Sequence, residues 1–502
     1  MSNTSLEDPV VEIESGLIKG RNRRGVQTFF DIPYAAPPVG ELRFAPPKPP
    51  ISWEDVRDAQ RPGKAAPQLP GEGLTNRIPV PWEEDCLKLN VTTPNADDQK
   101  RPVYVWIHGG GYLTGQGAIP WYDGSSFASS HDIVVVSINY RLGALGFCNL
   151  ASHFPEERDF ITSGLHGTMD QIAALEWVQK NISTFGGDPN QVTIGGESAG
   201  AFSVCNLLAS PHTEGLFHQA IAQSGAAHHI HTPESASNIA EDFLAELNHP
   251  NVNELRSIPV SEILEAQHRV IDKDENRDFG VDAFYPSWGS AVVPLPPSDL
   301  IREGAGSNIP LLIGTNEDEM ALWGITNFDE EKTDRYIKRI AKNEDPEKFK
   351  NVYRERLGDS EPGWLGCAIS SDWVFRIPAI RLAESREQFD SPTFMYQFSW
   401  DSTAFEGLLG AAHALEIPFT FNMLDQPGVT LFIGNGPRPD DLAQTMHDAW
   451  ATFIKTGTPA TSTLGEWPSY VSETRTVMNF DDECSLLSDP EPEERMLWHQ
   501  LR

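Results

Sequence analysis

A turn between a strand and a helix constrains this chain of 502 residues more than any other feature. Residues 185–200 read F-G-G-D-P-N-Q-V-T-I-G-G-E-S-A-G, which puts a G-x-S-x-G pattern directly after a β-branched segment. A strand that runs straight into a helix must reverse within a few residues, so Ser198 is predicted to have strained backbone and an exposed hydroxyl. Small neighbours such as Gly196 and Gly200 avoid a clash there. The helix expected at 201–208 would point its first N–H groups toward developing negative charge, which makes Ser198 a candidate nucleophile.

The remaining sequence alternates between strand and helix patterns. Residues 169–181, between two expected strands, and residues 442–455, after the last of them, repeat apolar side chains with the period of a helix. This alternation predicts an α/β fold with a mostly parallel sheet, helices on both faces, and functional residues at the carboxyl ends of the strands. The expected strands are short apolar runs, each followed by a Gly-rich or polar turn, at residues 103–107, 133–138, 192–194, 220–222, 310–313 and 393–398.

We expect a single domain over residues 1–502, because large α/β proteins often combine one sheet with long decorated loops. Two regions look like insertions into that domain. Residues 55–85 are Pro-rich and irregular, and residues 326–390 are charged, helical and aromatic. Either segment would be able to fold over the functional site as a lid.

The composition favours some classes of partner and opposes others. A net charge of −34 opposes binding to nucleic acid and to anionic membrane surfaces. We find no basic and apolar N-terminal segment and no window of eighteen apolar residues, so we expect no signal peptide, no membrane span and a cytoplasmic location. Reduced thiols are expected, because the cysteines are odd in number and sparse: Cys86, Cys148, Cys205, Cys367 and Cys484.

Ser198 would need a general base, because a serine hydroxyl is almost wholly protonated at neutral pH. In α/β folds with this turn, an acid and then a histidine follow the serine along the chain. The acid would come from Glu317, Asp318 or Glu319, just past the strand expected at 310–313, because residues at a strand's carboxyl end face the site.

His413 is the candidate base, because it follows the strand expected at 393–398. Its rivals are less well placed. His447 lies in the middle of an expected helix, where it would pack or face solvent, and His499 lies at the C-terminus.

Three consecutive glycines in W-I-H-G-G-G-Y, residues 106–112, follow another expected strand. Glycines let bare backbone N–H groups approach a substrate, and the N–H of Ala199 after the nucleophile would join them in an oxyanion hole. His108, which precedes the glycines, would orient the turn or face solvent. Tyr112, at the end of the turn, is a candidate substrate contact.

These motifs together resemble the type-B carboxylesterase and cholinesterase family of α/β hydrolases. The resemblance runs nearly from end to end, and it implies a serine carboxylesterase that forms an acyl-enzyme and needs no cofactor. It also rests on F-F-D-I-P-Y-A-A-P-P-V-G-E-L-R-F at 29–44, E-D-C-L-K-L-N-V at 84–91, N-Y-R-L-G-A-L-G-F at 139–147 and D-Q-I-A-A-L-E-W-V at 170–178.

The resemblance chooses among the acids. The family reads G-x-N-x-D-E-G with the last acid in the catalytic triad, which implies Glu319, with Met320 here in place of the glycine. We therefore expect the neutralisation of Glu317 or Asp318 to matter little. The family pattern G-x-x-H-x-x-E-[IL]-P supports His413.

The resemblance also implies further site residues. The oxyanion donors would be Gly110, Gly111 and Ala199, and Glu197 and Ser224 would support the histidine. The family's disulfide partner of Cys86 is absent here, with Ala66 at the corresponding position, which agrees with a reducing compartment.

Three histidines, His228, His229 and His231, fall where the family lines its acyl pocket. They would line the pocket as polar groups, lie in a solvated loop, or bind a metal; because they lack a fixed metal-ligand spacing, we expect no metal site.

Two alternatives to an esterase stay open at the level of sequence. A lactonase or an acyltransferase acting on a secondary metabolite or xenobiotic would use the same triad, because water and an alcohol compete for one acyl-enzyme. A non-catalytic interaction protein is the third possibility, since the family includes adhesion molecules that keep the fold and lose the triad. The presence of all three triad candidates argues against that third alternative.

Overall fold

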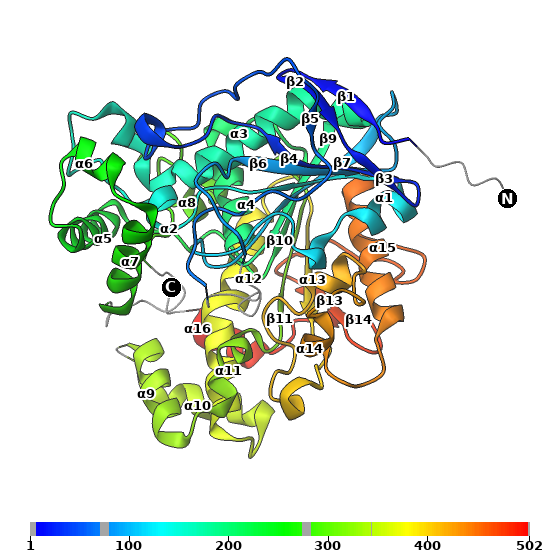
Figure 1. Ribbon diagram of the computed structural model, residues 1–502. Coiled ribbons are helices and arrows are strands. Elements are labelled where there is room, and N and C mark those ends of the chain that lie inside the picture. Colours follow the sequence, from blue (N-terminus) through cyan, green and yellow to red (C-terminus); the bar gives the residue numbers. More distant parts are fainter. Residues whose placement is uncertain (1–6, 71–79, 274–282, 343, 500–502) are drawn as a thin grey trace. The chain divides into compact units, whose positions relative to one another are not determined.

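The computed structural model describes residues 7–70, 80–273, 283–342 and 344–499 (Figure 1). The chain separates into two compact units. The first comprises Met1–Ile119, Asp123–Ala220 and Ala227–Gly306, and the second comprises Pro120–Tyr122, Ile221–Ala226 and Ser307–Arg502.

The strands of the first unit follow the order β9-β7-β8-β6-β4-β3. The central strands β9, β7 and β8 are parallel, whereas β6, β4 and β3 continue the sheet in antiparallel pairs. Nearly every residue of β7 and β8 is buried, as expected for parallel strands that are covered on both faces. The bounds are β3 (Arg21–Arg23), β4 (Val26–Pro33), β6 (Lys88–Thr93), β7 (Arg101–Ile107), β8 (Val134–Ile138) and β9 (Gly187–Glu197). A separate small sheet joins β1 (Val10–Ile13), β2 (Gly16–Lys19) and β5 (Arg57–Asp58).

Helices of the first unit pack on these strands. Helix α4 is buried along its whole length against β7 and β9, and α1 packs on β4, β6 and β8. The helices are α1 (Ser125–His131), α2 (Gly143–Phe147), α3 (His166–Asn181), α4 (Ala199–Ala209), α5 (Pro233–Glu246), α6 (Val252–Ser257), α7 (Val260–Lys273) and α8 (Pro297–Arg302).

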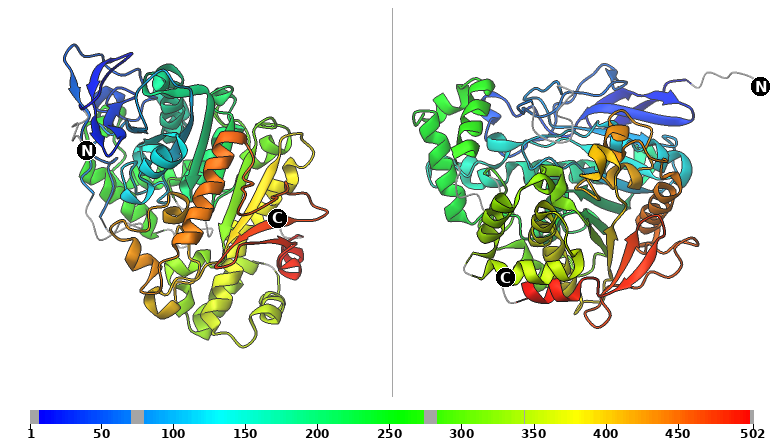
Figure 2. Two further views of the ribbon diagram at one scale, coloured as in Figure 1. Left: turned by 90° about the vertical axis from the view of Figure 1, so that its right-hand side faces the viewer. Right: turned by 90° about the horizontal axis from the view of Figure 1, so that it is seen from below.

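The second unit contains the parallel strands β11, β12 and β13, and β14 pairs antiparallel with β13. Figure 2 shows β13 and β14 in red as a hairpin at the edge of these strands. The bounds are β11 (Leu311–Asn316), β12 (Thr393–Phe398), β13 (Thr476–Phe480) and β14 (Ser485–Ser488). Strand β10 (Gln219–Gln223) begins in the first unit and ends in the second, where the N–H of Ser224 donates to the carbonyl of Gly314 at 2.8 Å.

Several helices of the second unit fill the segment expected to be an insertion at 326–390. Helix α11 continues through a π-helical turn (Asp372–Arg376) into α12. The helices are α9 (Glu330–Ala341), α10 (Pro346–Leu357), α11 (Pro362–Ser371), α12 (Ile377–Arg386), α13 (Ile417–Thr420), α14 (Val429–Ile433), α15 (Asp440–Thr456) and α16 (Pro492–Trp498). The helical character of 326–390 is confirmed, and its use as a lid stays a prediction.

The secondary structure expected from the sequence is confirmed. All six expected strands occur, as β7 to β12, and the helices expected at 169–181, 201–208 and 442–455 occur as α3, α4 and α15 with slightly wider bounds. Of the segment 55–85, residues 71–79 lie outside the described residues. A single domain stays a prediction of the sequence.

Two further observations bear on the sequence analysis. Among the described residues, no helix combines the length and the apolar character needed to cross a membrane. None of the five cysteines, all of which lie in the described part of the chain, forms a disulfide, and four of them are buried. Burial raises the pKa of the Cys86 thiol, which keeps it protonated.

Candidate active site

Ser198 lies between the end of β9 and the start of α4, with a φ of 55° and a ψ of −124°. A positive φ is costly for a residue with a side chain and marks a site of stored strain. The chain around it is tightly packed: a Cβ on Gly200 would lie 2.1 Å from the carbonyl oxygen of Ile107, and one on Gly196 would lie 2.5 Å from the carbonyl carbon of Gly200. The turn therefore has the strained geometry that the sequence predicts, and it requires both glycines.

The glycine turn after β7 packs against this strained turn. A Cβ on Gly109 would lie 2.6 Å from the carbonyl oxygen of Glu197 and 3.0 Å from the Cβ of Ser198. Gly110 and Gly111 have φ values of 106° and 60°, which favour glycine. In the described part of the chain, no group accepts a hydrogen bond from the amide N–H of Gly110, Gly111 or Ala199. These three donors are thus available to bind an oxyanion.

His108 supports the glycine turn from inside the protein. Its Nδ1–H donates to the carbonyl of Gly109 at 2.8 Å, and its ring stacks on Tyr140 with centroids 4.6 Å apart. The hydroxyl of Tyr140 donates to the carbonyl of His108 at 2.8 Å. Burial lowers the pKa of His108 to about 4, so the ring is neutral at neutral pH. The solvent-exposed alternative for His108 is wrong, because packing on Tyr140 buries the ring.

Tyr112 is fully buried behind the glycine turn, with a φ of 58°. Its hydroxyl accepts a hydrogen bond from Ser203 at 3.3 Å. Its ring makes edge-to-face contacts with Phe147 and Tyr285, with centroids 4.8 and 5.0 Å apart. The hydroxyl oxygen of Tyr285 lies 3.8 Å from the position of a Cβ on Gly111. Tyr112 therefore supports the turn, and direct contact of Tyr112 with substrate stays a prediction.

The three histidines expected in the acyl pocket differ in their surroundings. His229 is buried and stacks on Phe202 of α4, with centroids 3.8 Å apart and planes 16° apart. The half-buried ring of His228 lies 3.8 Å from that of His229. His231 is buried, with Nδ1 3.3 Å from the hydroxyl of Ser235. A solvated loop is therefore wrong for His229 and His231, because both rings pack inside the unit. The described residues contain no group of three His, Cys, Asp or Glu that would hold a metal.

The second unit brings His413 and Glu319 together. Nδ1 of His413 lies 2.5 Å from Oε2 of Glu319, and the N–H of His413 donates to the carbonyl of Glu319 at 3.2 Å. The other carboxylate oxygen of Glu319 accepts the N–H of Asn316 at 2.9 Å. The two neighbouring acids have other partners: Glu317 pairs with Arg356 at 3.3 Å, and Asp318 accepts the N–H of Ala411 at 3.1 Å. Of the three candidate acids, Glu319 is the one in contact with His413.

Two aromatic side chains that the sequence analysis missed pack on His413. Phe375, from the π-helical turn, lies 4.8 Å from the imidazole, and Trp323 lies 5.1 Å from it. Phe375 is buried, whereas Trp323 is 53% exposed. The sequence could have pointed to Trp323, because it lies four residues after Glu319, the acid that contacts His413. That of Phe375 was not, because it depends on the π-helical turn.

A buried polar network was also missed. The carboxylate of Glu416 accepts hydrogen bonds from Asn316 Nδ2 at 2.7 Å and Gln223 Nε2 at 3.0 Å. Asn316 Nδ2 also donates to the carbonyl of Ala412 at 2.7 Å, and Gln223 accepts from the indole of Trp450 at 2.9 Å. The network links the end of β11 to the segment before His413. In a sequence, amides at such distances along the chain carry no signal of their pairing.

The two residues expected to support the histidine are both buried. Glu197 ends β9, and its carbonyl packs against Gly109. Ser224 follows β10 with a φ of 52°, and its hydroxyl has no hydrogen-bond partner among the residues that the structure describes. Ser198, Glu197 and the oxyanion donors belong to the first unit, and Ser224, Glu319 and His413 to the second.

Comparison with known proteins extends these observations to the whole chain. The carboxylesterase family model matches residues 7–498. The para-nitrobenzyl esterase of Bacillus subtilis (strain 168) is 37% identical over 493 residues, which cover 97% of each chain. The phenmedipham hydrolase of Pseudarthrobacter oxydans is 35% identical over 492 residues, which cover 95% of each chain.

Solved structures agree with this assignment. A Geobacillus stearothermophilus carboxylesterase is similar with a TM-score of 0.86 at 38% identity, covering 98% of this chain and all of the other. A PNB esterase is similar with a TM-score of 0.84 at 36% identity. The α/β-hydrolase fold expected from the sequence is thereby confirmed. With matches over nearly all of its length, the chain belongs to the carboxylesterase family and is a carboxylic ester hydrolase.

Proposed function

We propose that the chain hydrolyses carboxylic esters through an acyl-enzyme on Ser198, with His413 as general base and Glu319 as its partner. The observation that carries the assignment of residues is the buried contact between His413 and Glu319 at 2.5 Å. A carboxylate only accepts hydrogen bonds, so the imidazole proton sits on Nδ1 and Nε2 is left as the acceptor for the serine proton.

The reaction proceeds in two halves. Ser198 Oγ attacks the ester carbonyl carbon while Nε2 of His413 takes its proton, and the carbonyl oxygen becomes an oxyanion. The amides of Gly110, Gly111 and Ala199 bind that oxyanion. When the intermediate collapses, the C–O bond to the alcohol breaks and the alcohol leaves with the proton from His413. Water, deprotonated by His413, then attacks the acyl carbon and releases the acid and free Ser198.

Glu319 stabilises the imidazolium that forms in each half-reaction. It is fully buried, and its second oxygen is held by the N–H of Asn316, so its carboxylate cannot turn away. A fixed negative charge in a site shielded from water interacts with the imidazolium more strongly than a solvated one would. No cofactor takes part in these steps.

The three histidines that follow β10 suggest the acyl specificity. We propose that His228, His229 and His231 make the acyl side of the pocket more polar than one lined by Phe and Leu. The stacking of His229 on Phe202, four residues after Ser198, supports this assignment. Short or oxygenated acyl groups would then be preferred over long alkyl chains. A para-nitrobenzyl ester is a suitable first substrate, because the relative from Bacillus subtilis is named for such an ester.

The lactonase and acyltransferase alternatives from the sequence analysis are variants of this proposal. Lactone opening or acyl transfer would use the same acyl-enzyme, with a ring oxygen as leaving group or an alcohol in place of water. A purely adhesive role is disfavoured, since Ser198 lies in a strained turn and His413 contacts the carboxylate of Glu319. A cytoplasmic location belongs to the proposal as well, and the absence of disulfides among the five described cysteines supports it.

A fluorophosphonate probe followed by peptide mapping tests the nucleophile. We expect covalent label on the peptide that contains Ser198, and no label in Ser198→Ala or in heat-denatured wild type. Label on another serine of the native protein, or native protein that stays unlabelled, would contradict the proposal. Assay of the same preparations with an ester, a lactone and an ester plus added alcohol separates hydrolysis from the two variants.

A further inference from the structure

Asp318 binds both polar backbone groups of Ala411, a residue two positions before His413. The N–H of Asp318 donates to the carbonyl of Ala411 at 3.0 Å. One oxygen of its carboxylate, Oδ2, accepts the N–H of Ala411 at 3.1 Å. Its neighbour Glu319 binds the N–H of His413 through its own carbonyl at 3.2 Å. Two consecutive residues after β11 thus hold the segment that carries the proposed general base.

The contact between Asp318 and this segment is close. Gly410 has a φ of 52°, and a Cβ there would lie 2.4 Å from Oδ2 of Asp318 and 3.0 Å from the ring of Trp364. The backbone therefore approaches the carboxylate to a distance that a side chain would prevent. Segment 410–413 cannot shift toward β11 without displacing the carboxylate of Asp318. If that carboxylate moves, the N–H of Ala411 loses its hydrogen-bond acceptor.

The charge of this carboxylate is finely balanced. Burial, followed by repulsion from Glu317 and from Asp401, raises the pKa of Asp318 to about 7, while the N–H of Ala411 and the guanidinium of Arg356 act in the opposite direction. Cys367 of α11 is a further titratable group in contact with this residue, and its Sγ donates to the carbonyl of Asp318 at 3.8 Å. Burial keeps that thiol protonated. Asp318 therefore changes its charge near neutral pH.

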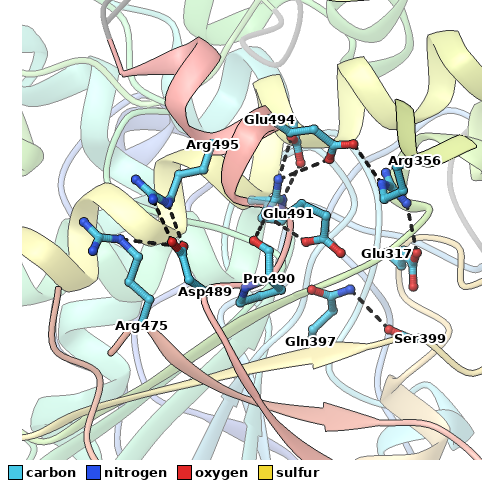
Figure 3. Close-up of polar contacts among 12 residues, drawn as sticks. Glu317, Arg356, Gln397, Ser399, Arg475, Asp489, Pro490, Glu491, Glu494 and Arg495 are labelled. Atoms are coloured by element: carbon cyan, nitrogen blue, oxygen red, sulfur yellow. Dashed lines mark hydrogen bonds and ion pairs between the residues drawn. The ribbon is translucent and has the colours of Figure 1, made fainter. Parts of the chain in front are cut away.

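Arg356 connects this corner of the unit to the C-terminal helix. Figure 3 shows Arg356 between Glu494 of α16 and Glu317, with contacts of 2.8 and 3.3 Å. Because Arg356 is held by both acids, its charge near Asp318 is fixed in place. Besides burial and the N–H of Ala411, the charges that act on the pKa of Asp318 are those of Glu317, Asp401 and Arg356, of which Glu317 is the nearest along the chain.

We propose that Asp318 is a positioning residue whose ionised carboxylate holds segment 410–413 in the place where His413 meets Glu319. A hydrogen bond to an ionised acceptor is about twice as strong as a neutral one, so protonation of Asp318 weakens the hold on Ala411. Protonation would then lower the share of molecules with His413 in place, and so lower kcat. This inference rests on the proposed role of His413, and it replaces the expectation that Asp318 matters little.

Asp318→Asn tests the inference, because asparagine has the shape of the protonated acid and no charge. Both proteins are assayed for ester hydrolysis from pH 5.5 to 8.5. Dividing wild-type kcat by variant kcat at each pH separates the contribution of Asp318 from the pH effects that the two proteins have in common. We expect a ratio of about five to ten at pH 8.5 that falls toward one at pH 5.5, with KM nearly unchanged. A ratio that does not change with pH would overturn the inference, since a merely structural role gives a constant loss.

Two further variants sharpen the test. Asp318 and Asp481 line one groove of the second unit, together with Glu317 and Asp401. Asp481→Asn makes the same change in this groove, away from Ala411, and should give a ratio near one at every pH. Glu317→Gln removes a like charge, so it should move the acid limb of the kcat profile to lower pH and leave the alkaline plateau unchanged. An unmoved acid limb would overturn the inference even if Asp318→Asn failed to fold. Failure of the proposed function looks different, because wild type itself would then hydrolyse no ester and take no fluorophosphonate label at Ser198.

Discussion

Nδ1 of His413 lies 2.5 Å from Oε2 of Glu319, and both side chains are buried. Phe375 packs on the imidazole at 4.8 Å, so the ring is held by a hydrogen bond at one edge and by an aromatic contact on its face. A catalytic base gains from such fixing, because misplacement by about 1 Å can cost on the order of 100-fold in rate. The pair is thus built to hold one tautomer and one orientation.

Replacement of the proposed nucleophile should abolish turnover. We expect Ser198→Ala to lower kcat by on the order of 10⁴ to 10⁶ while the protein stays folded, because one hydroxyl in a turn contributes little packing. Alanine also keeps the backbone strain at φ 55°, so the melting temperature should change little. Ester hydrolysis and thermal melting of the same preparation check this. More than a few per cent of wild-type turnover, with unchanged melting, would show that another residue is the nucleophile.

Neutralisation of Glu319, the proposed triad acid, should be far more costly than neutralisation of Glu317. Glu319→Gln removes the charge that stabilises the imidazolium and should lower kcat by roughly 10³ to 10⁴ without unfolding. Glu317→Gln is the matched control, since Glu317 binds Arg356 and does not touch His413. At pH 8.5 it should keep nearly full activity. Equal losses in the two variants would mean that the acid has been assigned to the wrong residue.

The buried, neutral His108 should make stability fall as the pH is lowered. Burial lowers the pKa of His108 from its usual 6.5 to about 4. The unfolded chain therefore takes up a proton near pH 6.5 that the folded protein takes up only near pH 4. The contribution of His108 is fully present above pH 6.5, and it falls by about 1.4 kcal/mol for each pH unit between these values.

Urea unfolding of wild type and His108→Asn from pH 4.5 to 7.5 checks the contribution of His108. Asparagine can keep the donor to the carbonyl of Gly109 and cannot titrate, so the free energy of unfolding should fall less steeply with decreasing pH in the variant. Part of the slope will remain, because burial also lowers the pKa of His166. Identical slopes in the two proteins would argue that His108 is not buried in neutral form.

Reduction should leave the protein unchanged, since none of its five cysteines is bonded to another. A native disulfide typically contributes about 2 to 4 kcal/mol, so its loss would lower the melting temperature clearly. We expect the same activity and melting temperature with and without dithiothreitol. A thiol titration of the denatured protein should find five reactive groups. A lower count, or a fall in melting on reduction, would contradict free thiols.

The sequence predicted much of this structure because its signals are local. A strained turn needs Gly196 and Gly200 next to Ser198, and such requirements are visible within a few residues. The six strands were found because buried parallel strands are continuous apolar runs. The sequence led to His413 and to the three acids at 317–319 because both segments follow strands, and strand ends of a parallel sheet gather at one edge; the family resemblance then chose Glu319.

The remaining features of the site depend on contacts between distant segments. Nothing in the sequence shows that the carboxylate of Asp318 meets the N–H of Ala411, 93 positions away. The stack of His229 on Phe202 likewise depends on how the loop after β10 returns to α4. Solvent exposure of His108 stayed open for the same reason, because it is buried by Tyr140, which follows the end of β8.

Acyl specificity tests the histidine cluster. If His228, His229 and His231 line the acyl side of the pocket, each added methylene of an unbranched acyl chain should gain much less than the roughly 0.8 kcal/mol of a fully apolar pocket. We therefore expect kcat/KM to stay level or fall from acetyl to decanoyl esters. Oxygenated acyl groups of similar length should be hydrolysed better than their alkyl counterparts.

Replacement of the histidines should shift this preference toward longer chains. His229→Phe keeps an aromatic ring against Phe202, where the centroids lie 3.8 Å apart, and removes its polar edge. Added to His228→Leu and His231→Leu, it should raise kcat/KM for decanoyl over acetyl esters by about tenfold, while fluorophosphonate labelling of Ser198 stays unchanged. His218→Leu serves as the control, because its ring accepts the N–H of Val192 in β9 and the change should not affect the preference for acyl chain length. A wild-type kcat/KM that climbs steadily with chain length would show that these histidines do not face the acyl group, since polar groups in contact with it would reduce the gain from each methylene.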